Sequence, residues 1–234
     1  MKKRRILQTL KDTFRKINPW GFVAVVAVLI GLASGFWNWR LSSQLARTNF
    51  EVARLYALNN HPEFAVEAAK RAAVSGKDIP VMRRLIAEEY IKLDNFQEAE
   101  KILTEVLVAN ASDAQAVYLL ALSRYYQHDL NAAEEKLKQS ISMSPGTADH
   151  TYDLLGTIYL EQEKNDLAEE AFKKGLVLRP QSANLHNGLG VAYFQNGKTE
   201  LAHEEYHKAL DIEPNHPNAT RNLRLLEGGQ PDGQ

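Results

Sequence analysis

The sequence predicts an all-α protein in which a single N-terminal transmembrane helix precedes an α-solenoid of five helix-pair repeats and a C-terminal capping helix. Two observations carry this prediction: an uncharged apolar stretch between Trp20 and Trp37, and a period of 34 residues through most of the remaining chain. A repeat of that length is typical of stacked helical pairs, each too small to bury its apolar face alone. Cysteine is absent, which excludes disulfides, thiolate metal sites and a cysteine nucleophile.

Residues 19–40 are the predicted transmembrane anchor. The 18 uncharged residues from Trp20 to Trp37 would span about 27 Å as a helix rising about 1.5 Å per residue, which is close to the hydrocarbon thickness of a bilayer. Tryptophans bracket the stretch, as amphipathic rings do at membrane interfaces. Three small residues spaced four apart offer a contact for another transmembrane helix, namely Ala27, Gly31 and Gly35.

A cleaved signal peptide is the alternative to a retained anchor. Small residues at positions 33 and 35 would suit a signal peptidase. The long basic leader, the length of the apolar run and the tryptophans at both of its ends favour retention.

The charge distribution predicts which way the anchor points. Residues 1–19 hold seven lysines and arginines and one aspartate, which gives them a charge of +6. The net charge of the chain is −1, so the remaining residues carry −7. By the positive-inside rule, the basic amphipathic segment 1–18 stays in the cytoplasm and the repeats lie across the membrane. In a bacterium this is a single-pass inner-membrane protein with a periplasmic repeat domain. A mildly acidic domain without a basic stripe argues against nucleic acid as a partner.

The repeat domain spans residues 41–227 and is followed by a polar tail at 228–234. Each unit reads as two amphipathic helices joined by a short turn. The units are predicted at residues 46–79, 80–113, 114–148, 149–182 and 183–216, with a capping helix at 217–227. The cap is polar on its outer face, as the open end of a solenoid requires.

The fourth and fifth units share a distinctive set of residues. The fourth has Tyr152, Leu155, Gly156, Tyr159, Ala168, Phe172 and Pro180, and the fifth has Leu189, Gly190, Tyr193, Ala202, Tyr206, Ala209 and Pro214. This pattern strongly resembles the tetratricopeptide repeat (TPR) family over residues 46–216. The resemblance implies a protein-binding solenoid that is not an enzyme, holds no cofactor, and has a concave surface lined by the first helix of each unit.

Small residues occupy the eighth and twentieth positions of every unit, which lets its two helices approach closely. They are Ala53, Ala87, Ala121, Gly156 and Gly190, then Ala65, Ala99, Ala133, Ala168 and Ala202. The early units depart from the family pattern elsewhere. The third unit has Arg124 where tyrosine is usual and Tyr125 one place later.

Residues 203–207 read HEEYH and match the H-E-x-x-H helix of zinc metalloproteases. Two histidines one turn apart can bind zinc, and the glutamate after the first can activate its water. In the repeat pattern, however, Tyr206 is a packing residue, so both histidines fall on the outer face of a second helix. Glu227, a distant third ligand on paper, lies beyond a turn in the cap. We therefore predict no catalytic residue and no metal site, and a zinc hydrolase is only a remote alternative.

The concave groove is the predicted partner-binding site. Positions 2, 5, 9 and 12 of each unit should face it, and many hold arginine, tyrosine or asparagine, which suit recognition surfaces. The predicted groove residues are Arg47, Phe50, Arg54, Arg84, Glu88, Tyr118, Leu122, Tyr125, Asp153, Asn184, Asn187, Phe194, Asn218 and Arg221. We expect the arginines and tyrosines of the first three units to contribute most.

These features predict a membrane-anchored TPR adaptor or scaffold that mediates protein–protein interactions in the assembly or quality control of cell-envelope proteins. The architecture resembles single-pass bacterial inner-membrane TPR proteins, and the expected partners are proteins of the membrane or envelope. The alternative is a fixed structural or assembly subunit of a larger membrane complex, such as cytochrome c maturation, pilus or secretion machinery.

Overall fold

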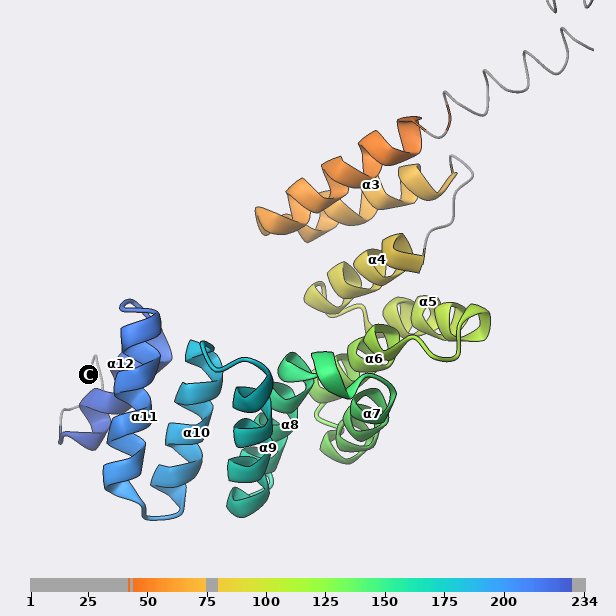
Figure 1. Cartoon of the computed structure of the whole chain (residues 1–234). Coiled ribbons are helices and arrows are strands. Elements are labelled where there is room, and N and C mark those ends of the chain that lie inside the picture. The colour runs from red at the N-terminus through yellow and green to blue at the C-terminus, as the bar shows by residue number, and fades with distance from the viewer. Residues whose placement is uncertain (1–41, 43, 75–79, 229–234) are drawn as a thin grey trace, which may run out of the picture.

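The computed structural model describes residues 42, 44–74 and 80–228. The predicted leader (1–18) and anchor (19–40), with the small residues Ala27, Gly31 and Gly35, lie outside these ranges. Within them, no helix is both long and apolar enough to cross a membrane. The described residues form helices and turns only, and the predicted α-solenoid is confirmed (Figure 1).

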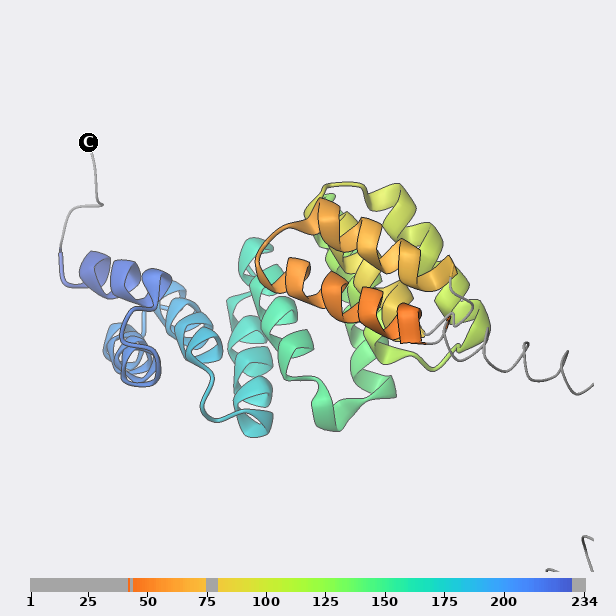
Figure 2. The same cartoon turned by 90° about the horizontal axis from the view of Figure 1, so that it is seen from above.

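Helical pairs stack in chain order from the N-terminal pair to the cap (Figures 1 and 2). Residues 44–58 form the first helix of the first unit, which precedes α3 (Pro62–Val74). The following helices are α4 (Pro80–Lys92), α5 (Phe96–Ala109), α6 (Ala114–Tyr126), α7 (Leu130–Met143), α8 (Asp149–Glu161), α9 (Asn165–Leu178), α10 (Ala183–Gln195), α11 (Thr199–Ile212) and α12 (Pro217–Leu226), with a 3-10 turn η1 (Pro145–Thr147) before α8.

Turn chemistry marks the ends of the helices in each unit. Side chains of Asn95, Asp113, Asp129 and Ser182 each accept a hydrogen bond from a backbone N–H three residues further on, and so cap α5, α6, α7 and α10. The fifteenth residue of each unit, between its two helices, is left-handed, with φ between 54° and 72°. The five residues are Asn60, Asp94, His128, Glu163 and Gly197. This repeated conformation turns the chain back at the same place in every unit.

The predicted small positions lie in the core. All ten are buried, and the glycines among them meet aromatic rings. A Cβ atom built on Gly156 would lie 2.6 Å from the ring of Phe172, and one on Gly190 would lie 2.6 Å from the ring of Tyr206. Gly188 was not predicted as a contact, yet a Cβ there would lie 2.4 Å from Phe172. The Phe172 ring is therefore held between α8 of its own unit and α10 of the next.

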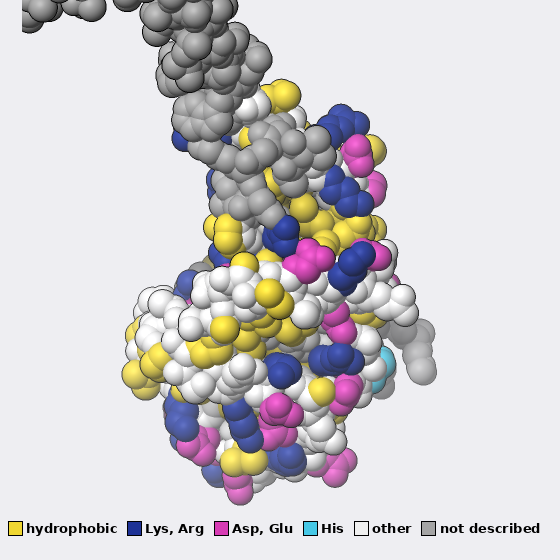
Figure 3. Space-filling model, turned by 90° about the vertical axis from the view of Figure 1, so that its right-hand side faces the viewer, with side chains coloured by type: hydrophobic (Ala, Val, Ile, Leu, Met, Phe, Trp, Pro, Cys, Tyr) yellow, Lys and Arg dark blue, Asp and Glu magenta, His cyan; other side chains and the backbone are white. Residues whose placement is uncertain are grey.

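The surface carries charges of both signs. On the face shown in Figure 3, lysines and arginines alternate with aspartates and glutamates rather than forming a field of one sign. Many are joined in pairs one helical turn apart, such as Lys173 with Glu169 at 2.6 Å and Lys174 with Glu170 at 2.6 Å. Such pairs support exposed helix faces by small amounts.

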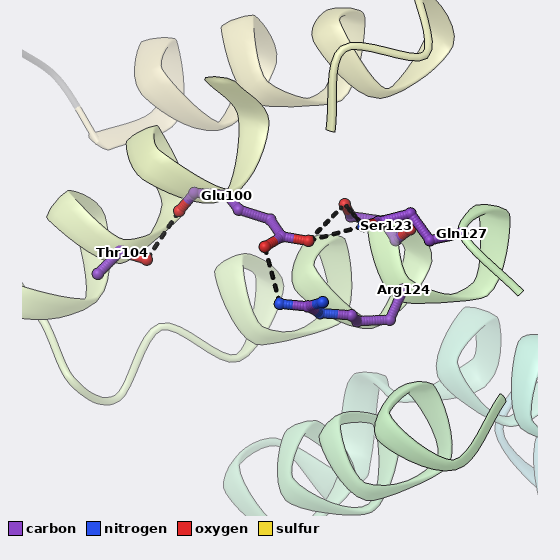
Figure 4. Close-up of polar contacts among 5 residues, drawn as sticks. All are labelled: Glu100, Thr104, Ser123, Arg124 and Gln127. Carbon is purple, nitrogen blue, oxygen red and sulfur yellow. Dashed lines mark hydrogen bonds and ion pairs between the residues drawn. The ribbon is translucent and has the colours of Figure 1, made fainter. Parts of the chain in front are cut away.

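Polar contacts also join each unit to the next, and Figure 4 shows one of them. The carboxylate of Glu100 on α5 accepts hydrogen bonds from Ser123 Oγ at 3.2 Å, Gln127 Nε2 at 2.7 Å and Arg124 Nη2 at 2.8 Å. Arg124 stands where the family pattern has tyrosine. The structure explains this departure from the family pattern, because Arg124 pairs with Glu100 of the preceding unit.

At every boundary between units, side chains from the same three positions of the repeat lie close together, and we call each such cluster a junction. A junction comprises positions 21 and 25 of one unit and position 11 of the next. In the third and fourth junctions a lysine at position 25 pairs with the glutamate at position 21 and lies over the ring of a tyrosine at position 11. The junctions are Val66, Lys70 and Tyr90; Glu100, Thr104 and Arg124; Glu134, Lys138 and Tyr159; Glu169, Lys173 and Tyr193; and His203, His207 and Glu227.

Candidate functional site

The first helices of successive units form the inner face of the solenoid. Contacts join α4 to α6, α6 to α8, α8 to α10 and α10 to α12. Each of the second helices α5, α7, α9 and α11 packs against the first helix of its own unit and the first helix of the next. Because first helices lie closer to one another, their solvent-facing sides make the concave surface, which contains the predicted groove.

At the N-terminal end of the groove, Arg47 and Arg54 are exposed. Arg54 Nη1 pairs with Glu51 at 3.2 Å on the same helix, and an exposed pair of this kind contributes little to stability. Phe50 is half-buried and packs on the apolar cluster that the first helix shares with α3 and α4. The two arginines therefore remain available to a partner, whereas Phe50 belongs largely to the fold.

Arg84 has a structural role that the sequence did not indicate. Its guanidinium pairs with the carboxylate of Asp113, which is buried. The other oxygen of that carboxylate accepts a hydrogen bond from the N–H of Ala116 at 3.0 Å and so caps α6. Removing one partner of such a pair leaves a buried charge uncompensated. Arg84 thus joins α4 to the start of α6, and its loss would disturb the fold as well as the groove.

The middle of the groove is made of half-buried side chains. Tyr118, Leu122 and Tyr125 pack on the neighbouring apolar clusters. Burial raises the pKa of Tyr118 to about 12. Burial, together with a 2.5 Å hydrogen bond from its hydroxyl to Glu161, also raises the pKa of Tyr125. Both phenols stay protonated at neutral pH. Burial likewise raises the pKa of Glu88, which lies 3.9 Å from Lys92 Nζ.

Towards the C-terminal end, most of the predicted groove residues are polar. We call Asp153, Asn184, Asn187 and Phe194 the Asp153 patch. The Asp153 carboxylate has no hydrogen-bond or ion-pair partner among the described residues. The amide oxygens of Asn184 and Asn187 accept hydrogen bonds from His216 Nε2 at 2.8 Å and Asn222 Nδ2 at 3.0 Å. Their NH₂ groups are thereby left to donate to a ligand.

The remaining members of the groove complete this end. Phe194 is 52% exposed. Asn218 and Arg221 on α12 are exposed. His216 is buried and caps α12, because its Nδ1 accepts the N–H of Ala219 at 3.1 Å. Its Nε2 must therefore carry the proton that bonds Asn184, and this fixes the orientation of that amide.

Burial raises the pKa of Asp153 to about 6, and the nearby Asp149 raises it further, while His150 and His216 act in the opposite direction. The ordinary value is 3.8. Between about pH 4 and pH 6 the folded protein holds a proton that the unfolded chain has released. The free energy of unfolding therefore falls as the pH rises through this window.

Replacing Asp153 with asparagine should remove the contribution of Asp153 to that fall and raise the free energy of unfolding at pH 7.5 by about 1–3 kcal/mol. The physical reason is that the buried charge, which has no compensating partner, is removed. Denaturant melts between pH 4 and pH 8 measure both effects. Asp211→Asn, at an exposed site on α11, is the matched control and should shift stability by less than about 0.5 kcal/mol. An unchanged pH profile in Asp153→Asn would contradict this assignment.

The HEEYH segment lies on α11, and its residues serve different purposes. Tyr206 is buried against Gly190, as the repeat pattern predicts. Glu205 is buried and bonds His186 Nδ1 at 2.6 Å and Lys208 Nζ at 2.7 Å. The interaction with Glu205 raises the pKa of His186. Glu205, which stands at a variable position of the motif, therefore joins α11 to α10, and Glu204, the glutamate that follows the first histidine, is exposed.

Glu227 lies closer to the histidines of this segment than its place in the sequence implies. Its Oε1 is 3.5 Å from His203 Nε2. Ligand atoms of His203, His207 and Glu227 all fall within 4.8 Å of one another. The His203 and Glu227 side chains are 43% and 56% exposed, which is not the shielded pocket that zinc-dependent hydrolysis needs.

Sequence reasoning missed several residues around the groove. Asp113 precedes a helix, and aspartate at that position predicts a cap. Histidine is not a usual cap residue, so the start of α12 after His216 is marked only by Pro217, a residue common at the first helical position. Neither position indicates the second contact, with Arg84 or Asn184, which depends on how neighbouring units stack.

Comparisons with known proteins agree with this architecture. A TPR repeat model matches residues 156–197, and tetratricopeptide repeat models match residues 183–216 and 84–148. A search of curated protein sequences found no significant match.

Three solved structures illustrate the likeness. A chain of the APC/C hetero-tetramer Cut9–Hcn1 is 20% identical with a TM-score of 0.68, covering 78% of this chain and 36% of that one. A thermophilic TPR protein of Thermus thermophilus is 18% identical with a TM-score of 0.66, covering 78% and 98%. MamA from Desulfovibrio magneticus is 21% identical with a TM-score of 0.57, covering 74% and 97%. The chain thus spans about a third of the Cut9–Hcn1 chain, and these likenesses concern the fold.

The repeat matches and the shared fold define the class of protein: an all-α solenoid whose repeats serve protein–protein interaction. The chain belongs to the tetratricopeptide repeat family.

Proposed function

We propose that this protein is an adaptor or scaffold that binds a segment of a partner protein along its concave face, centred on the Asp153 patch. The observation that carries the proposal is the half-buried Asp153 carboxylate, which makes no hydrogen bond or ion pair with any of the described residues. A lysine or arginine of the partner would compensate this charge, since an opposite charge within a few ångströms favours the ionised form.

The surroundings of Asp153 suit a peptide segment. The NH₂ groups of Asn184 and Asn187 can donate to backbone carbonyl oxygens of an extended chain, and Phe194 offers an exposed apolar anchor. A small set of polar groups beside an aromatic anchor is a common composition of the centre of an interface. The ligand class is therefore a segment that pairs a cationic residue with an apolar one.

Photo-crosslinking in cells tests this proposal. A benzoylphenylalanine residue at position 194 should yield a discrete protein adduct, because Phe194 lies in the groove. The control position is Val177 on α9, which is 80% exposed and belongs to a second helix. Equal adducts from both positions, or an adduct from position 177 alone, would refute a groove-bound partner.

We further propose that the protein is anchored in the bacterial inner membrane by residues 19–40 and serves the assembly or quality control of envelope proteins. The support is the uncharged stretch behind a basic leader. Because the chain lacks cysteine, a single cysteine is a clean reporter of topology. An impermeant thiol reagent outside intact spheroplasts should label a cysteine placed at Gln181 and spare one placed at Gln8. Labelling of the cysteine at position 8 alone would show that the chain has the opposite orientation in the membrane.

A fixed subunit of a larger membrane complex is the second candidate, and exposed apolar side chains of the first unit favour it. Leu55, Leu58 and Phe64 are 59%, 79% and 52% exposed. A subunit permanently covered at this end would crosslink from position 58 at full occupancy, whereas an adaptor would crosslink mainly from the groove at position 194.

A further inference from the structure

The last junction differs from the other four in its chemistry. Each of the first four holds a lysine or arginine, namely Lys70, Arg124, Lys138 and Lys173. These cations pair with a glutamate, lie over a tyrosine ring, or do both. The junction between α11 and α12 instead holds two histidines and a glutamate. It offers a carboxylate and two imidazoles but no lysine or arginine at the corresponding positions.

Its geometry follows from the repeat. His203 and His207 are separated by four residues on α11, so both project from one face of that helix. Position 11 of the cap, Glu227, faces position 21 of the fifth unit in the way that Tyr193 and Arg124 face the units before them. This places Glu227 Oε1 3.5 Å from His203 Nε2 and brings all three ligand atoms within 4.8 Å.

We propose that His203, His207 and Glu227 bind a divalent transition-metal ion, of which Zn²⁺ is the best fit, and that the ion joins the capping helix α12 to the fifth unit. Two imidazoles and a carboxylate are a ligand set that zinc accepts. With bonds of about 2.0–2.1 Å, tetrahedral ligand atoms lie about 3.4 Å apart, which the His203–Glu227 distance already matches. The exposed side chains of His207 and Glu227 and the partly exposed one of His203 can close the remaining distance by rotating about their torsions.

The ion would supply the positive charge that lysine or arginine supplies at the other junctions. It would also hold α12 in place, since binding to the folded state alone raises stability. Solvent would complete the coordination at this exposed surface. The site is separate from the concave groove, and the inference does not depend on the proposed partner.

The test uses the full chain in detergent, without a polyhistidine tag and freed of metal by a chelator. Titration with Zn²⁺ should show one ion bound per chain at micromolar concentration or below, and the melting temperature should rise by several degrees. Co²⁺ should give the visible absorption of a low-symmetry site. The double variant His203→Ala with His207→Ala should lose all three responses, and Glu227→Gln should weaken binding at least about tenfold.

Two control variants separate binding from general effects. His150→Ala removes an exposed histidine that lies 3.7 Å from Asp149 and should leave Zn²⁺ binding unchanged. The triple variant His203→Glu, His207→Lys, Glu227→Tyr gives the last junction the composition of the one before it. Its melting temperature should be at least that of the metal-free wild type and should not change when Zn²⁺ is added. Absence of binding in wild type, or binding that persists in the double histidine variant, would overturn the proposal.

Discussion

Gly188→Ala is expected to lower the free energy of unfolding by about 1–3 kcal/mol, although alanine ordinarily stabilises a helix relative to glycine by about 1 kcal/mol. Here alanine is expected to destabilise the protein instead, because the new Cβ would lie 2.4 Å from Cε1 and 2.6 Å from Cζ of Phe172. The ring cannot retreat, since it already touches Gly156 on its other side and is almost fully buried. Denaturant melts of the purified variant measure the change.

The control for this variant is Gly146→Ala in η1. A Cβ at Gly146 would meet nothing within 4 Å, so this substitution should be neutral or slightly stabilising. If Gly188→Ala were as stable as Gly146→Ala, the close approach of α10 to Phe172 would be wrong.

The double variant Asp153→Asn with Phe194→Ala should weaken binding of the partner segment by about a hundredfold, since the loss of two anchors in a small interface costs a few kcal/mol. It should not weaken the fold. Phe194 is half exposed, and removal of the Asp153 charge is stabilising on the argument given above. Isothermal titration with the segment captured at position 194 measures the affinity.

A matched double variant outside the groove provides the control. Glu135→Gln with Val177→Ala likewise changes one carboxylate to an amide and truncates one exposed apolar residue, on α7 and α9. Its affinity should stay within about twofold of wild type, as expected of surface positions that touch no ligand. A similar loss in both double variants would mean that the groove is not the site.

The fold followed from the sequence because the repeat signals are local. The period of 34 residues sets the boundaries of the units, and α4, α6, α8 and α10 begin at the predicted boundaries. Within each unit, the two small positions and the cap residues determine the local structure. The role of Gly188 was missed, since it contacts an aromatic ring of the preceding unit. Contacts between units depend on how they stack, and a single unit does not encode this.

The groove was harder to derive for the same reason. Position within the unit indicates which side chains face it but says nothing of their partners. Arg84 was expected to be free for a ligand, and the structure pairs it with Asp113. The sequence does not distinguish Asp153 from the other predicted groove residues, yet burial raises the pKa of its carboxyl group to about 6. Glu227 is far from the histidines in the sequence and lies beyond a turn, although the register of the cap brings its carboxylate to 3.5 Å from His203 Nε2.

A double-mutant cycle between Asp153 and the cationic residues of the partner segment tests the central claim most directly. Dissociation constants are measured for wild type and Asp153→Asn, each with the native segment and with one lysine or arginine changed to methionine. If Asp153 pairs with that cation, the two changes should be strongly non-additive, with a coupling energy of about 1.5 kcal/mol or more for one cationic position. Additive losses at every cationic position of the segment would contradict the account.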